Sequence, residues 1–227
     1  MAAVTLTTLR ARARERADQV NSDFVADAAT GLDAWINEGV QKLWEKLIKA
    51  FGEEFVEKSQ VFTTTASDSV ALPSDFFILY GVDLDLGAGF KSLTRFNRAE
   101  RNFQRAQLGT YFNYPRYKLS GMGTTGVCRL LPAPTGVFNG KFWYAPVAPV
   151  LTTGTDTVDF PNGWERYVVN WAALKLLGKE ESSTSDLWKE IQSDDNDLAE
   201  LAIRRDQAQP HSAVDMDAVN ADPEWFR

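Results

Sequence analysis

Apolar residues recur at helical spacing at both ends of the chain and at shorter, less regular intervals in between. The spacing predicts helices over residues 5–20 and 32–51, and Gly52 is a stop signal for the second. The helical period returns over residues 162–178, and a last helix is predicted over residues 186–207. The two ends of the chain are therefore expected to pack together as a helical bundle.

The middle of the chain, residues 56–160, has a different pattern. Short runs rich in Val, Thr, Phe and Tyr alternate with Gly and Pro, which is typical of strands and turns. One helix is expected among them, over residues 96–107, with Arg98, Arg101 and Arg105 roughly opposite its apolar face. The predicted strands are residues 56–65, 76–86, 116–120, 126–131 and 141–144.

The predicted helix over residues 32–51 has a broad apolar face. Its core-facing positions are Leu32, Ile36, Val40, Leu43, Leu47 and Phe51. Trp35, Trp44 and Ile48 widen this stripe on both flanks. A helix with one neighbour needs a narrower stripe. Two interpretations stay open: it is the central helix of the protomer's own bundle, or it packs inward and also across a subunit boundary.

Polar residues predict a cap at the start of the second helix and an irregularity in the last helix. Thr30 and Asp33 have the spacing of a capping pair at the start of the second helix. In the last helix, Asp194 falls inside the apolar stripe. Either that helix breaks near residues 193–195, or Asp194 meets a basic group on a partner.

These elements predict an α+β protein in which N- and C-terminal helices form a bundle, followed in sequence by an extended C-terminal tail. The expected parts are bundle helices in 1–55, a β-rich lobe with one helix in 56–160, bundle helices in 161–208 and a docking tail in 209–227. The tail is polar and ends with Trp225 and Phe226. Ordering its backbone costs more than burying two aromatics returns. We expect it to dock along a partner with these two anchors, or alternatively to fold back on its own protomer.

Charge and composition narrow the function. The net charge is −7, which disfavours general DNA coating because that relies on clustered cations. The arginines within residues 10–16 form either a solvated basic face or a partner-binding face. Those of the predicted middle helix face either solvent or a phosphate or acidic partner. The start of the chain lacks an export pattern and no long apolar run occurs, so we expect neither export nor a membrane span.

Candidate chemistry is sparse. Cys128 is the only cysteine and lies in a predicted strand, so it is expected to be a core residue and excludes a cysteine zinc site. The glycines of residues 121–126 have dinucleotide-binding spacing, but a strand follows them, so we expect a hairpin. Asp83 and Asp85 lack the further ligands of a calcium loop, and His211 has no catalytic neighbours in sequence. No enzyme, cofactor or metal site is predicted.

The order of several segments resembles the head–tail adaptor (connector) proteins of tailed bacteriophages over roughly residues 5–207. The segments are WINEGVQKLW at 35–44, ALPSDF at 71–76, YPRYKL at 114–119, RLLPAP at 129–134, FPNGW at 160–164 and Ala172-Ala173. Two features depart from the family: a long lead-in at residues 27–31 and a large β-rich middle. These departures leave open a related neck or tail-completion protein.

The resemblance implies a structural virion protein of the head–tail junction, made in the host cytoplasm. Such proteins form a homo-oligomeric ring, often a dodecamer, under the portal protein. The ring extends the DNA channel, lets DNA pass without sequence-specific binding and presents a docking surface for tail or nozzle proteins. The residues expected at partner interfaces are Trp35, Trp44, Ile48, Arg98, Arg101, Arg105, Asp194, Trp225 and Phe226. The alternative function is a DNA-binding packaging or regulatory protein, in which the arginines of residues 10–16 and of the predicted middle helix would bind the DNA.

Overall fold

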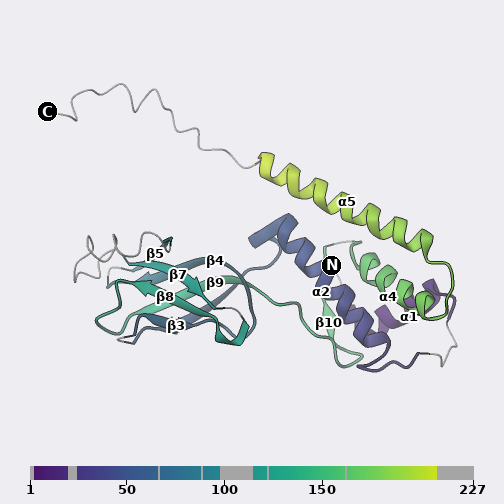
Figure 1. Ribbon diagram of the computed structural model, residues 1–227, viewed down its shortest axis with the longest axis horizontal. Helices are drawn as coiled ribbons and strands as arrows, with labels where there is room; N and C mark the ends of the chain where they lie inside the picture. The colour runs from purple at the N-terminus through teal and green to yellow at the C-terminus, as the bar shows by residue number, and fades with distance from the viewer. Residues whose placement is uncertain are drawn as a thin grey trace, which may run out of the picture.

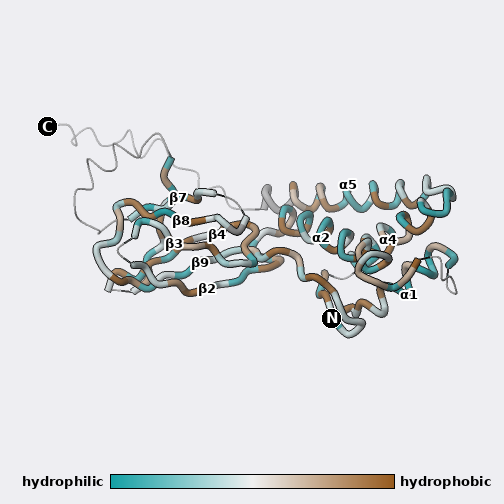
Figure 2. The backbone as a smooth tube through the Cα atoms, turned by 60° about the horizontal axis from the view of Figure 1, so that its bottom comes forward, coloured by the Kyte–Doolittle hydropathy of each residue, from teal (hydrophilic) through white to brown (hydrophobic). Residues whose placement is uncertain are grey.

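A helical half and a β-rich half lie end to end along the long axis of the molecule (Figure 1). The computed structural model describes residues 3–19, 25–65, 67–87, 89–97, 115–121, 123–161 and 163–208. Figure 2 gives the same arrangement from a turned viewpoint, with the helices on one side and the sheets on the other. The α+β fold expected from the sequence is confirmed.

The helical half is a bundle with α2 at its centre. Its helices are α1 (Leu6–Arg16), α2 (Leu32–Phe51), α4 (Glu165–Lys179) and α5 (Ser185–Ala208). Helix α2 packs against the other three helices, and its apolar stripe is buried from Leu32 to Leu47. A Cβ on Gly39 would lie 3.3 Å from Trp171 Cβ and Cδ1. Glycine at this position therefore allows α4 to approach α2 closely.

The β-rich half is built from two four-stranded sheets with an apolar core between them. The first has the order β2 (Lys58–Thr63), β9 (Asn139–Pro146), β4 (Phe76–Asp85) and β5 (Phe90–Ser92). The second has the order β3 (Ser69–Ala71), β8 (Val127–Leu131), β7 (Arg116–Ser120) and β6 (Thr94–Arg95). All neighbours are antiparallel except β6 and β7. The buried residues between the sheets are Phe62, Val82, Leu84, Cys128, Leu130, Phe142 and Tyr144.

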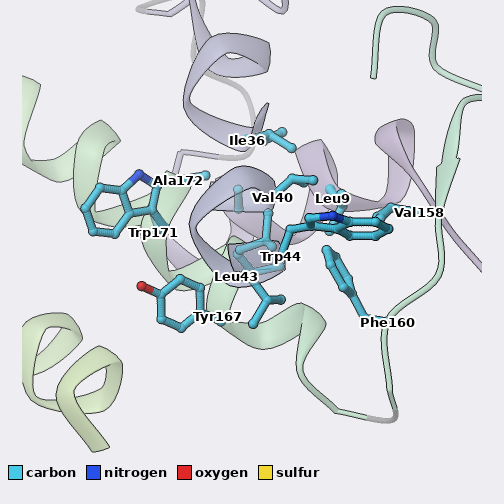
Figure 3. Packing of buried hydrophobic residues seen from close by; sticks show 14 of the residues in the cluster. Leu9, Ile36, Val40, Leu43, Trp44, Val158, Phe160, Tyr167, Trp171 and Ala172 are labelled. Carbon is cyan, nitrogen blue, oxygen red and sulfur yellow. The ribbon is translucent and has the colours of Figure 1, made fainter. Parts of the chain in front are cut away.

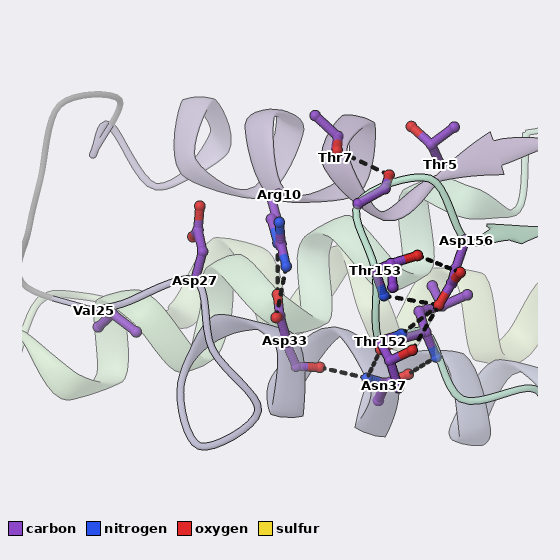
Figure 4. A network of polar contacts seen from close by, with 12 residues as sticks. Thr5, Thr7, Arg10, Val25, Asp27, Asp33, Asn37, Thr152, Thr153 and Asp156 are labelled. Carbon is purple, nitrogen blue, oxygen red and sulfur yellow. Dashed lines mark hydrogen bonds and ion pairs between the residues drawn. The ribbon is translucent and has the colours of Figure 1, made fainter.

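A short two-stranded sheet connects the start of the chain to the segment that returns from the β-rich half. It pairs β1 (Val4–Thr5) with β10 (Thr157–Val158). The turn before β10 is organised by Asp156, whose Oδ2 accepts hydrogen bonds from the backbone N–H groups of Thr152 and Thr153 at 2.7 and 2.8 Å (Figure 4). Thr7 Oγ1 of α1 donates to the Gly154 carbonyl and Asn37 Nδ2 of α2 donates to the Leu151 carbonyl, both at 2.9 Å, which holds the returning segment against the two helices.

Several predicted elements are confirmed, but α1 ends at Arg16 instead of near residue 20, and two further predictions are wrong. Helix α2 has the predicted bounds, and Gly52 ends it with a φ of 57°. The predicted capping pair is wrong: the N-cap is Gly31, without a side-chain cap, and Asp33 binds Arg10 instead. The predicted break near residues 193–195 is also wrong, because α5 runs through it.

The structure describes only part of the remaining predictions. Phe96 and Asn97 are not helical. The rest of the helix predicted over residues 96–107 lies outside the described residues, as does the predicted tail of residues 209–227. The strands β1, β3, β5, β6 and β10 were not expected from the sequence.

Candidate interaction surface

A groove lies where the helical half meets the β-rich half. It has a volume of about 430 Å³ and runs between α2 and residues 147–150, the segment that follows β9 and that we call the strap. Trp44 and Phe77 contribute apolar side chains, and Glu38 and Glu45 contribute carboxylates from α2. The groove is therefore apolar with an acidic rim.

Side chains of α2 hold the strap at both of its ends. At the first end, Trp44 Nε1 donates to the carbonyl oxygen of Pro146 at 3.0 Å. At the second end, Asn37 Nδ2 donates to the Leu151 carbonyl at 2.9 Å, and Leu151 N–H donates back to Asn37 Oδ1 at 2.8 Å. Between these tethers Val147 and Val150 are 48% and 71% exposed. The strap thus presents apolar side chains to solvent on a fixed backbone.

The two carboxylates of the rim differ in their partners. Glu38 forms an ion pair with Lys175 at 3.3 Å. Glu45 accepts a hydrogen bond from Gln41 Nε2 at 3.2 Å and, within the described part of the chain, takes part in no ion pair. Its charge therefore remains available to a basic group from another molecule.

A second exposed apolar surface lies on the first sheet, on the face turned away from the second sheet. Phe142 and Tyr144 of β9 point into the core, so Lys141 and Trp143 point outward. Trp143 covers Gly81 and donates from Nε1 to Asp83 Oδ2 at 2.6 Å. The Lys141 ammonium lies 4.9 Å from the Phe90 ring centroid and 5.8 Å from that of Trp143.

We call Val61, Phe90, Lys141 and Trp143 the outer-face patch. Val61 is paired with Lys141 across β2 and β9 and is 60% exposed, and Phe90 is 48% exposed. Among the described residues Lys141 forms no ion pair. The patch is therefore apolar with one positive charge at its centre.

The predicted interface residues of α2 pack within the protomer. Ile48 is 4% exposed and Trp44 is 9% exposed. Trp35 is partly buried against the same core. Figure 3 shows Trp44 on the side of α2 that faces Val158 and Phe160, with Trp171 on another side. Trp44 also lines the groove, while a contact of Trp35 or Ile48 with a neighbouring subunit stays a prediction.

The arginines of α1 bind acidic groups of their own chain, which neither sequence interpretation anticipated. Arg10 makes a bidentate pair with Asp33, from Nε to Oδ1 and Nη2 to Oδ2, both at 2.7 Å (Figure 4). The other three pairs are Arg12–Glu165, Arg14–Asp27 and Arg16–Glu190. Arg98, Arg101, Arg105, Trp225 and Phe226 lie outside the described residues.

Asp194 meets a basic group of its own chain. Asp194 lies on α5 and is 3% exposed. Its Oδ1 atom forms an ion pair with Arg166 of α4. Within the described residues its Oδ2 is buried without a hydrogen-bond partner. Burial raises the pKa of the Asp194 carboxyl, against the opposing effect of Arg166. We therefore expect the charged side chain to lower the stability of the helical half.

Replacing Asp194 with leucine is expected to raise the free energy of unfolding at pH 7 by about 1 kcal/mol, because a buried, half-satisfied charge is exchanged for apolar packing. Arg166 loses little, since its side chain is 60% exposed. A carboxyl with a raised folded-state pKa destabilises increasingly as the pH rises above its unfolded value of 3.8. The extra unfolding free energy of the leucine variant, measured by urea unfolding, should therefore decrease as the pH is lowered. A leucine variant less stable than the wild type at pH 7 would contradict this account.

Cys128 is a core residue, as the sequence predicted. It is fully buried, and burial raises the pKa of its thiol to about 12. Because the thiolate is the reactive form, we expect no reaction with a chromogenic disulfide reagent in native buffer and rapid reaction in denaturant. Equal rates in the two conditions would show that the thiol is accessible in the folded protein.

The other motifs have structural roles where they are described. The glycine segment joins β7 to β8 as the expected hairpin, with a 3₁₀ turn at Gly123–Thr125. Asp83 and Asp85 lie in β4. Among the described residues there is no group of His, Cys, Asp and Glu side chains that could hold a metal ion. Within the same ranges, no helix has the length and apolarity needed to cross a bilayer.

Comparison with known proteins identifies the family. The family model described as SU10 adaptor protein matches residues 4–216. A search of curated proteins gives no match. The family match confirms the resemblance to phage head–tail adaptors drawn from the sequence. The chain belongs to the SU10 adaptor protein family, a family of bacteriophage head–tail adaptors.

Proposed function

We propose that this adaptor forms an oligomeric ring under the portal protein, extends the DNA channel and provides the docking surface for tail components. The observation that carries the proposal is the groove between α2 and the strap. Exposed apolar surface held on a fixed backbone is typical of a protein–protein contact.

The charge balance supports a conduit rather than a DNA-binding protein. The net charge is −7, and each arginine of α1 is paired with a carboxylate of the same chain. A lumen without clustered free cations would let the duplex slide, because tight duplex binding depends on counterion release by such cations. The proposed role is structural, without catalysis. Docking through the tail of residues 209–227 remains part of this proposal.

Mixing the purified chain with the portal protein of the same phage tests this function. We expect a complex of fixed stoichiometry in size-exclusion chromatography with light scattering. The matched measurement is duplex DNA binding by the free chain at rising salt, where we expect weak affinity. Absence of a portal complex together with tight, steeply salt-dependent DNA binding would favour the DNA-binding alternative instead.

A further inference from the structure

Two surfaces of this chain complement each other in charge and in apolar character. We propose that the outer-face patch of one copy docks in the groove of a second copy, with Lys141 of the first against Glu45 of the second. This contact rests on the proposed ring and names the surfaces that would close it.

Each surface carries a charge without an ion-pair partner among the described residues, Lys141 on the patch and Glu45 at the groove. Asp83 lies opposite Lys141 in the sheet register, but its oxygens accept from Ser92 Oγ at 2.7 Å and Trp143 Nε1 at 2.6 Å. The Lys141 ammonium instead lies over two aromatic rings. In the groove, Lys175 pairs with Glu38 and not with Glu45. Among the described residues of these two surfaces, Lys141 and Glu45 therefore form no ion pair, and each lies on an apolar surface.

The apolar parts also match. The patch offers Phe90 and Val61, and the strap offers Val147 and Val150, all between 48% and 71% of full exposure. Joining the two surfaces would remove these side chains from water. A desolvated ion pair surrounded by apolar contacts resembles the centre of a specific interface, where complementary charge sets the register.

The positions of the two surfaces determine the kind of assembly. The patch lies on the first sheet of the β-rich half, whereas the groove lies at the junction with the helical half. A contact between two different surfaces leaves one free groove and one free patch on every pair of copies. Such a head-to-tail contact adds further copies and gives a ring where the rotation between copies closes, in contrast to the self-complementary contact of a twofold dimer.

Charge reversal tests the contact. We expect Lys141→Glu alone and Glu45→Lys alone each to weaken self-association by about tenfold or more, because each opposes like charges across the interface. The double variant should assemble like the wild type. An equimolar mixture of the two single variants should also assemble, because alternating copies restore an opposite-charge pair at every contact.

Assembly should be followed by sedimentation velocity, with and without portal protein, after circular dichroism has shown that each variant is folded. Lys118→Glu is the matched control for the patch, since Lys118 lies on the second sheet beside Leu119. Glu180→Lys, at the exposed end of α4, is the control for the groove. Both controls should assemble normally.

Three outcomes would overturn the contact. If the wild type forms rings and both single variants assemble equally well, the subunit interface lies elsewhere. Loss of portal binding in Glu45→Lys, without rescue by Lys141→Glu, would assign the groove to the portal. If the wild type forms no rings even with portal protein, the proposed function is wrong, and the contact that rests on it is wrong as well.

Discussion

Asp33→Ala is expected to lower the free energy of unfolding by about 2–3 kcal/mol. Asp33 is 5% exposed in the first turn of α2 and accepts both hydrogen bonds of the Arg10 guanidinium. Those hydrogen bonds raise the pKa of Arg10 in spite of desolvation. Removing the carboxylate leaves a partly buried cation without its partner, which is the costly way to break an ion pair. The midpoint of urea unfolding measures the effect.

The matched control for this variant is Asp68→Ala. Asp68 pairs with Arg129 at 3.2 Å, and the side chains are 42% and 51% exposed. Exposed pairs contribute little, so this substitution should cost less than about 1 kcal/mol. Equal losses in the two variants would contradict the structural role assigned to the Arg10–Asp33 pair.

Leu43→Ala is expected to lower the free energy of unfolding by about 3 kcal/mol. Leu43 is fully buried in the centre of the bundle, on the α2 face that meets the other helices (Figure 3). Truncation loses the transfer free energy of the side chain and leaves a cavity that close-packed helices fill only in part. Thermal or urea unfolding of the full chain measures the loss.

Ile203→Ala on α5 is the control for the core substitution. Ile203 is also an apolar helical residue, but it is 58% exposed. Its truncation should change stability by less than about 0.5 kcal/mol. If both substitutions cost the same, the packing of α2 at the centre of the bundle would be wrong.

The sequence predicted the elements that local patterns specify. The bounds of α2 follow from its 3.6-residue period and from Gly52, whose φ of 57° combined with a ψ of −130° favours a residue without a side chain. Strand β7 was predicted with its full bounds because Arg116–Ser120 is separated by turn residues from its neighbour. The short strands β5 and β6 were missed because three or two residues carry no period, and their pairing depends on distant partners.

Ion-pair partners from distant parts of the chain were harder to predict than the buried face of a helix. The period placed Asp194 on the buried face of α5 but could not find Arg166, which is 28 residues earlier. The same limit led to the wrong cap at Asp33, whose partner Arg10 is 23 residues away. The helical period predicts which face of a helix is buried, but it does not predict which residue of another element contacts that face.

The groove and the outer-face patch were not recognised from the sequence. Alternation in β9 placed Lys141 and Trp143 on one face, but not whether that face is covered. The strap offered a weak signal, an apolar run interrupted by Pro149. Its exposure follows from the tethers made by Trp44 and Asn37, which join residues more than a hundred positions apart and leave no local pattern.

Negative-stain electron microscopy of the chain mixed with its portal protein tests the central claim most directly. The account predicts closed rings of this adaptor stacked coaxially on the portal, with a central channel. Adaptor molecules that remain single, or that decorate the portal individually without contacts to one another, would contradict it.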